Sequence, residues 1–414
     1  MNISNERLIN GLLKGFNGNA TPQDVKAWLS QDVEIVAPTM RSTSTDLWPA
    51  IWALAAVLER QLYGSVYIRC GLRNSLLAPS SLGPRCRFVD EPQEVALTIQ
   101  LGIETEVASN VVGDACVGAI SIGRTFEGRR PPPTAIECFV LAGFLGFATI
   151  ARFTGIPEHR SEFATPTLNV TYDSHKVADT LRRLEGFTSI GLGQLGQAKL
   201  ALLFFLLRGK MRGRRVALID DDRFQKENGR TQLLLAEEAD WVGQDKVTYI
   251  GARIAAWGAD VVPVYEKINW IWRRGTAHPP LALLGLHDLE ARRMACAAGF
   301  ERIIESGVGT NLLQPRISWH ALSGDRALGR RLFADELRAI DRREAFSGTW
   351  VEDLKNTPGG CGWVEFMGVS ATAPCLGTAA AAFALAELGG PLQPVSGSAL
   401  LWSQCIAPYR ETSM

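Results

Sequence analysis

The sequence lacks several patterns that would each assign it to a class of protein. None of its eight cysteines forms a C-x-x-C pair, so a compact zinc-knuckle spacing is absent. Lys plus Arg equals Asp plus Glu, 43 each, which gives no electrostatic case for nucleic acid or membrane as a partner. The apolar stretches at 138–151 and 198–207 are too short to span a bilayer, and the N-terminus shows no signal pattern. We therefore expect a soluble, cytoplasmic protein with reduced cysteines.

The length and composition predict a globular chain of two or three domains. With 414 residues, of which 46% are hydrophobic and 21% charged, the chain is too long for one ordinary core. We divide it into an N-terminal helical segment at 1–45, an α/β domain at 46–155, a linker at 156–185 and a second α/β domain at 186–414.

The first domain shows helical apolar spacing at 47–62 and a strand-like run at 65–68. A second strand is expected at 117–122, and a helix opens at Pro131 and runs to about Phe153. Neither strand is followed by a glycine-rich turn that would hold phosphate. This domain is therefore expected not to bind nucleotide itself.

The second domain alternates strands and helices regularly, which predicts a mostly parallel sheet. Strands are expected at 187–190, 216–219, 260–265, 281–284 and 302–307, and helices at 197–208, 244–257, 290–297 and 378–387.

A glycine turn follows the first of these strands. It has the form GxGxxG and comprises Gly191, Gly193, Gln194 and Gly196, followed by the apolar helix. Such a turn lets backbone N–H groups and a helix N-terminus approach phosphate, and it is shared by many nucleotide-binding proteins. The next strand ends at Asp220, where a carboxylate can accept ribose hydroxyls. If only these two features were present, the chain could equally be an NAD-dependent dehydrogenase.

Further motifs distinguish the chain from a dehydrogenase. Asp220-x-Asp222 is followed by Asn228, Arg230 and Gln232, and then by Gly243-Gln244-x-Lys246. In this order the motifs resemble the ubiquitin-activating enzyme superfamily of ThiF/MoeB type, over roughly residues 186–390. The resemblance implies a Rossmann-like ThiF-type adenylation domain that uses ATP and Mg²⁺. Because several such enzymes pair a competent half with a degenerate one, residues 46–155 are either an inactive adenylation half or an unrelated cap.

The resemblance also implies roles for single residues. Asp220, with Asp222 beside it, would bind the ribose, and Asn228, Arg230 and Lys246 would bind the triphosphate, so we expect Asp220 and Lys246 to be exposed. The chain departs from the family at the arginine, which falls two residues after Asn228 instead of three, with Thr231 in the usual place. Asn-Gly is also a common turn dipeptide, so a purely structural turn is the alternative for Asn228.

A metal ligand is expected after the strand at 281–284. The family has a magnesium-binding aspartate there, whereas this chain has His287 followed by Asp288. Mg²⁺ prefers carboxylate oxygen, and we therefore assign Asp288 to the metal. The alternative is that the histidine weakens adenylation.

Cys361 is the candidate acceptor for a thioester. It lies in Pro358-Gly359-Gly360-Cys361-Gly362, at a place similar to that of the family's acceptor cysteine, and its flanking glycines favour an exposed thiol. Cys375 is the second candidate. Cys70, Cys116, Cys138 and Cys296 lie in apolar surroundings that predict burial.

The resemblance implies an activating enzyme that adenylates the C-terminal carboxylate of a ubiquitin-like or sulfur-carrier protein and transfers it to Cys361. Some enzymes of this kind belong to bacterial ubiquitin-like conjugation systems. A conjugating enzyme and a second copy of the chain, in a homodimer, are further partners that fit. The alternatives are adenylation of a peptide or small molecule in natural-product biosynthesis, and a non-catalytic nucleotide-binding scaffold.

Two surface hypotheses complete the predictions from sequence. Trp270 and Trp272, beside Arg273 and Arg274, form either a docking surface for a partner or a half-buried strand. Arg69 and Arg73 follow a strand of the first domain and would be able to reach the nucleotide of the second.

Overall fold

The computed structural model describes most of two α/β units. The described residues are 21–37, 41–71, 77–101, 111–116, 119–122, 167–169, 183–235, 239–286, 288–307, 316–332 and 397–400, with single helical positions between 135 and 153. Arg73, His287, Cys361, Cys375 and the helix expected at 378–387 lie outside these residues.

The first unit contains a seven-stranded sheet in the order β3-β2-β1-β4-β5-β6-β7. Its elements are α2 (Pro22–Leu29), β1 (Val33–Val36), α3 (Arg41–Gln61), β2 (Val66–Arg69), β3 (Cys86–Phe88), β4 (Leu97–Leu101), β5 (Val111–Cys116), β6 (Ala119–Ile122) and β7 (Thr167–Asn169). The sheet therefore reaches beyond 46–155, because β1 lies in the segment 1–45 and β7 in the segment 156–185.

The second unit contains another seven-stranded sheet, in the order β10-β9-β8-β11-β12-β13-β14. Its elements are β8 (Gly186–Ile190), α6 (Gln194–Leu206), β9 (Arg215–Ile219), the 3-10 helices Lys226–Arg230 and Ala239–Trp241, α7 (Lys246–Ala256), β10 (Asp260–Val264), β11 (Leu281–Leu284), α8 (Leu289–Cys296), β12 (Arg302–Gly307), β13 (Arg316–Ala321), α9 (Arg326–Arg331) and β14 (Gly397–Leu400).

The two sheets have the same topology. In each, the first five strands of the order pair in parallel and the last two pairings are antiparallel. The prediction of an α/β fold with a mostly parallel sheet is confirmed. In the second unit the order reverses between β8 and β11, and sheets of this kind usually bind ligands outside the carboxyl ends of the strands at such a reversal.

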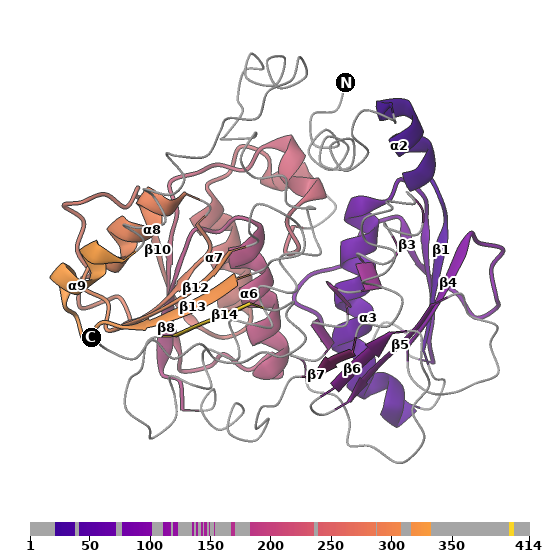
Figure 1. Ribbon diagram of the computed structural model, residues 1–414, viewed down its shortest axis with the longest axis horizontal. Coiled ribbons are helices and arrows are strands. Elements are labelled where there is room, and N and C mark those ends of the chain that lie inside the picture. Colours follow the sequence, from indigo (N-terminus) through magenta and orange to yellow (C-terminus); the bar gives the residue numbers. More distant parts are fainter. Residues whose placement is uncertain are drawn as a thin grey trace.

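The two units share one hydrophobic core. Figure 1 shows α3 and α6 lying between the two sheets. The ring of Trp52 on α3 meets that of Phe205 on α6 with centroids 5.6 Å apart, and Phe139 of the first unit lies 5.9 Å from the same ring. Both helices are apolar around most of their circumference, because each faces its own sheet on one side and the other unit on the other.

The predicted elements of the second unit agree with the structure from β8 to β12 to within a few residues. Strands β1, β3, β4, β5, β7, β13 and β14 were not predicted. Most of these are short, and β3 and β13 carry polar residues, so no extended apolar pattern marks them. None of the described helices combines the length and the apolarity that crossing a bilayer needs.

Candidate functional site

The glycine turn joins β8 to α6 at the carboxyl edge of the second sheet. Gly191 has φ +80°, a conformation that favours glycine, and its N–H donates to the carbonyl of Ile219 at 2.9 Å. A Cβ on Gly196 would lie 2.1 Å from the carbonyl oxygen of Gly191, so only glycine fits there. A Cβ on Gly193, the N-cap of α6, would meet nothing within 4 Å. Internal geometry therefore accounts for Gly191 and Gly196 but not for Gly193.

Asp220 follows the last residue of β9, contacts this turn and is buried, with 8% of its surface exposed. Its Oδ2 accepts from the N–H of Leu192 at 2.5 Å, and its Oδ1 accepts from the N–H of Asp222 at 2.8 Å. Burial raises the pKa of this carboxyl, against the opposing effect of the Lys246 charge and the two N–H groups. The expectation that Asp220 is exposed was wrong, because its carboxylate ties the turn to the end of β9.

Lys246 is the first residue of α7 and is also buried, with 6% exposed, contrary to the prediction. Its Nζ lies 2.6 Å from Oδ2 of Asp222, whose side chain is 62% exposed. A cation at a helix N-terminus is unfavourable against the helix dipole. Asp222 compensates that charge within the protein.

Asn228 lies in the 3-10 helix Lys226–Arg230, between β9 and α7. The Oδ1 of Asn228 accepts from the N–H of Gln225 at 2.8 Å, and its carbonyl accepts from the N–H of Thr231 at 3.0 Å. Both bonds are those of a structural turn. Thr231, in the place of the family's arginine, is buried. The side chain of Arg230 is outside the described part of the structure, and its contact with phosphate stays a prediction.

Asp288 is the N-cap of α8. Its two carboxylate oxygens accept from the N–H groups of Glu290 and Ala291 at 3.0 and 3.3 Å. A cap of this kind needs no metal. Among the described residues, three carboxylates that could hold a metal ion together are those of Asp220, Asp221 and Asp222. One oxygen from each lies within 4.8 Å of the other two. Magnesium binding by Asp288 stays a prediction.

Of the four cysteines predicted to be buried, the structure describes the burial of three. Cys138 and Cys296 are buried, and Cys70 is half-buried. Burial raises the pKa of the Cys296 thiol, which makes it a poor nucleophile. Cys361 and Cys375 lie outside the described residues, and the acceptor role of Cys361 stays a prediction.

The second unit can be compared with known proteins on this basis. A family model described as the BilD C-terminal domain matches residues 186–393. The chain belongs to this family. The match begins at the first residue of β8, and it confirms the resemblance that was drawn from the motifs.

Solved structures give more distant likenesses to this BilD-family chain. E. coli MccB with ATP is 13% identical, with a TM-score of 0.33, covering 73% of this chain and 94% of that one. E. coli MccB with AMPCPP and MccA is 14% identical, with a TM-score of 0.34 and the coverages 73% and 94%. PaaA is 14% identical, with a TM-score of 0.36, covering 57% of this chain and 74% of that one. No curated protein matches the chain.

Two polar residues of α6 were missed by the sequence prediction. Gln197 is buried and donates through Nε2 to the carbonyl of Leu192 at 3.0 Å. Lys199 is buried as well and donates to the carbonyl of Leu284. The available signal was that each interrupts an otherwise apolar helix, where a polar residue needs a partner.

Lys199 belongs to a buried charged group in this BilD-family domain. Arg292 Nη1 lies 3.2 Å from Glu305 Oε2, and both side chains are almost fully buried. Burial lowers the pKa of Lys199 from 10.5 to about 7, which the Glu305 carboxylate opposes and the Arg292 charge enhances. Lys199 thus binds the last residue of β11, and Arg292 donates through Nε to the carbonyl of Leu286, two residues further on, at 2.9 Å.

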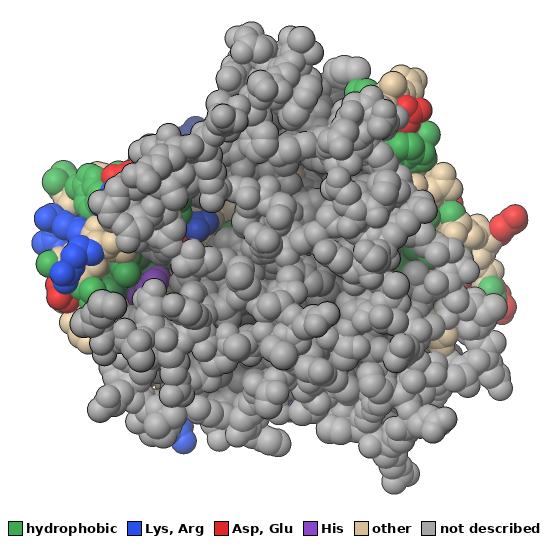
Figure 2. Space-filling view, in the orientation of Figure 1, with side chains coloured by type: hydrophobic (Ala, Val, Ile, Leu, Met, Phe, Trp, Pro, Cys, Tyr) green, Lys and Arg blue, Asp and Glu red, His purple; other side chains and the backbone are tan. Residues whose placement is uncertain are grey.

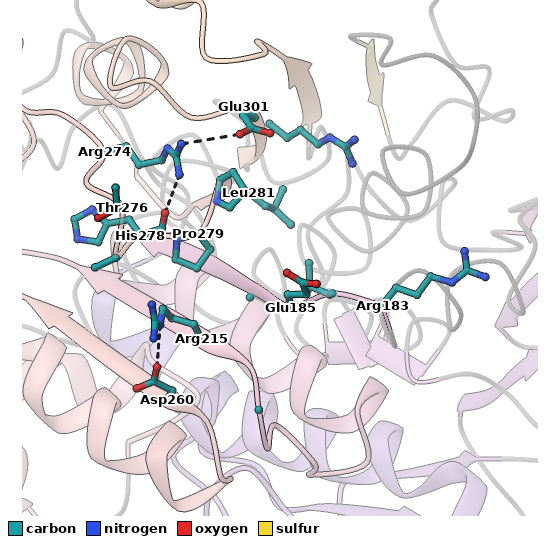
Figure 3. Close-up of a pocket in the computed structure, with 16 residues that line it drawn as sticks. Arg183, Glu185, Arg215, Asp260, Arg274, Thr276, His278, Pro279, Leu281 and Glu301 are labelled. Atoms are coloured by element: carbon teal, nitrogen blue, oxygen red, sulfur yellow. Dashed lines mark hydrogen bonds and ion pairs between the residues drawn. The ribbon is translucent and has the colours of Figure 1, made fainter.

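A cavity of about 940 Å³ lies at the opposite edge of the sheet, away from the glycine turn. Its walls include the first residues of β8 to β12, as Figure 3 shows for Arg215, Asp260 and Leu281. Two ion pairs lie in its wall: Arg215 Nε is 2.8 Å from Asp260 Oδ2, and Arg274 Nη2 is 4.0 Å from Glu301 Oε1. None of the predicted nucleotide-binding residues lines this cavity.

Trp270 and Trp272, for which the sequence offered a docking surface or a half-buried strand, have different environments in the structure. Trp272 is buried, its Nε1 donates to Glu266 at 2.9 Å, and its ring stacks on Phe300, so it is a core residue. The half-buried ring of Trp270 lies under the guanidiniums of Arg293 and Arg330, at 5.4 and 6.0 Å. Figure 2 shows basic side chains gathered at the left edge of this BilD-family chain, on the side of α9. Docking at Trp270 stays a prediction.

Proposed function

We propose that this chain is an ATP-dependent adenylating enzyme that activates the C-terminal carboxylate of a small ubiquitin-like or sulfur-carrier protein. One arrangement carries the proposal. Leu192 in the glycine turn binds Asp220, the N–H of Asp222 binds the same carboxylate, and the Asp222 side chain binds Lys246. Three motifs far apart in sequence thus form one connected group. Membership of the BilD C-terminal domain family supports a bacterial ubiquitin-like system.

ATP would bind at the carboxyl edge of the sheet. The turn and the N-terminus of α6, a 13-residue helix, offer N–H groups and a positive dipole end to the phosphates. The open space where a Cβ of Gly193 would lie supports close approach of a phosphate there. Each Asp220 oxygen accepts one N–H bond, which leaves each with a lone pair for a ribose hydroxyl.

The chemistry is a displacement at the α-phosphate. A carboxylate oxygen of the carrier forms a bond to that phosphorus as the bond to the β-phosphate oxygen breaks, giving an acyl-adenylate and pyrophosphate. Lys246 and Arg230 would offset the developing negative charge. Mg²⁺ would supply further charge neutralisation, and Asp288 is its proposed ligand, since each of its oxygens keeps a lone pair beyond the helix cap. Cys361 would then take the acyl group as a thioester and release AMP.

We propose that the first unit is a degenerate adenylation half. The common strand order of the two sheets supports this origin. The connection from β8 to α6 carries Gly191 and Gly193, whereas the equivalent connection from β1 to α3 reads Ala37-Pro38-Thr39-Met40 and has no glycine. A phosphate would therefore find no comparable turn in the first unit. Because the proposed reaction consumes ATP, we propose that the protein acts in the cytoplasm, with a conjugating enzyme or a second copy of the chain as possible partners.

A non-catalytic scaffold is the second candidate. It is favoured by Thr231, which is buried and supplies no cation where the family has an arginine. The test between the two is ATP–pyrophosphate exchange with small proteins that end in glycine, each compared with a version lacking that glycine. The enzyme should exchange label only with the intact carrier. ATP binding without exchange for any carrier would favour the scaffold.

A further inference from the structure

An arginine of the first unit hydrogen-bonds to residues 232–235 of the second unit, the loop that follows the 3-10 helix Lys226–Arg230. Arg60, near the end of α3, is buried, with 7% exposed. Its Nε donates to the carbonyl of Gln232 at 2.9 Å, and its Nη2 donates to the carbonyls of Leu233 and Leu235 at 3.3 Å each. These acceptors are 172 to 175 residues away in sequence. Only an arginine offers this fork of donors to several carbonyls at once.

The other side of the same loop is held by Gln197 of α6. Its Oε1 accepts from the N–H of Leu234 at 3.0 Å, and its Nε2 donates to the side chain of Gln232. The same Nε2 donates to the carbonyl of Leu192 in the glycine turn. Residues 232–235 are therefore fixed between Arg60 and Gln197, and Gln197 is bound to the turn.

Ser80 adds a second contact from the first unit, because its Oγ donates to the carbonyl of Leu233 at 3.0 Å. Leu233, Leu234 and Leu235 are all buried. Without Arg60 and Ser80, the carbonyls of Leu233 and Leu235 would lose these donors inside the protein, and a buried carbonyl without a donor is costly. The conformation of this loop thus depends on a unit that lacks a glycine turn of its own.

We infer that Arg60 is a positioning residue for the nucleotide site. Through residues 232–235 and Gln197 it fixes the turn at Leu192, whose N–H in turn binds Asp220. The first unit then acts as a built-in support for ATP binding, beyond any origin as a degenerate half. This inference rests on the proposed function, since it assumes that the turn receives the nucleotide.

The test compares Arg60→Met with a matched control in the full chain. Methionine keeps an aliphatic side chain of similar reach but removes every donor. Hydrogen–deuterium exchange should become faster at 231–235 and also at 190–197, and the Kd for Mg·ATP should rise about tenfold, since bonds to charged groups are lost. Arg60→Lys, which keeps the charge but not the fork, should give smaller changes of the same kind and serves if Arg60→Met does not fold.

The control is Arg69→Met. The sequence hypothesis had Arg69 reaching the nucleotide of the second domain, whereas in the structure its Nε lies 2.9 Å from Oε1 of Glu34 within the first unit. Its loss should therefore speed exchange in β1 and β2. ATP affinity should stay within about twofold, because the loop at 231–235 is untouched. If Arg60→Met speeds exchange only at 231–235 and leaves the turn and ATP affinity unchanged, Arg60 merely joins the two units. If the wild type does not bind ATP, the proposed function fails, while exchange at 190–197 still decides the coupling.

Discussion

The ammonium of Lys246 lies 2.6 Å from the carboxylate of Asp222, so the lysine and the acid expected at one nucleotide are already in contact. The pair connects α7 to the end of β9, and the N–H of Lys246 also donates to the carbonyl of Asp222 at 3.0 Å. An ammonium has three donors, and one bond to Asp222 leaves others for phosphate. The contact therefore fixes the position of the Lys246 ammonium and leaves it N–H donors for a phosphate.

Lys246→Ala should reduce ATP–pyrophosphate exchange by about 100-fold or more, because it removes a charge-assisted phosphate contact. The fold should survive, since the partner left behind, Asp222, is exposed. Lys267→Ala, at an exposed lysine of the same unit, is the control. Exchange within about threefold of wild type in Lys246→Ala, a difference of ~0.7 kcal/mol, would contradict the assigned role.

Asp220→Ala should abolish ATP binding and also destabilise the protein. It leaves the N–H groups of Leu192 and Asp222 without their acceptor, which should lower the free energy of unfolding by about 1–3 kcal/mol. Urea unfolding and equilibrium ATP binding measure the two effects. Asp221→Ala, at the exposed neighbour, should change neither greatly. Unchanged ATP affinity in Asp220→Ala would remove Asp220 from the site.

The second unit should bind Mg·ATP in preference to NADH. A turn with an acid beyond it suits either ligand, whereas Lys246 beside the turn suits a triphosphate. Direct titration of both ligands against the full chain measures the preference. Tighter binding of NADH would favour the dehydrogenase alternative.

Cys361→Ala should abolish a thiol-sensitive adduct with a carrier protein, seen on a non-reducing gel in the presence of Mg·ATP. Cys375→Ala should retain the adduct. Cys296→Ala serves as a control, because burial raises the pKa of that thiol and keeps it unreactive. The reverse pattern would assign the acceptor to Cys375.

Lys199 should make stability depend on pH. Its pKa is about 7 in the folded protein and 10.5 ordinarily, so between these values the unfolded chain binds more protons. The free energy of unfolding should therefore rise from pH 7 towards pH 10, and the cost of burying the charge is fully present below pH 7. Lys199→Met should reduce this slope in urea unfolding at pH 7 and pH 9. Lys210→Met, at an exposed lysine, should preserve it, and equal slopes in both variants would refute the assignment.

The sequence by itself determined the order of the motifs and the alternation of strands and helices from β8 to β12. These features are local, because an apolar run, a glycine turn and an acid at a strand end are all read within a few residues. The same local reading found that the first unit lacks a phosphate-binding turn. It could not predict short strands such as β1 and β13, whose four to six residues carry little periodicity.

Only the tertiary structure decided that Asp220 and Lys246 are buried, and that both units repeat one strand order. Burial depends on what packs against a residue. Asp220 follows β9, whereas Leu192, whose N–H binds its carboxylate, follows β8. The role proposed for Arg60 depends on carbonyls more than 170 residues away, and backbone carbonyls carry no sequence signal at all. The motifs proposed to bind nucleotide could therefore be found in the sequence, whereas the contacts of Arg60 and Gln197 beside them follow only from the packing of the two units.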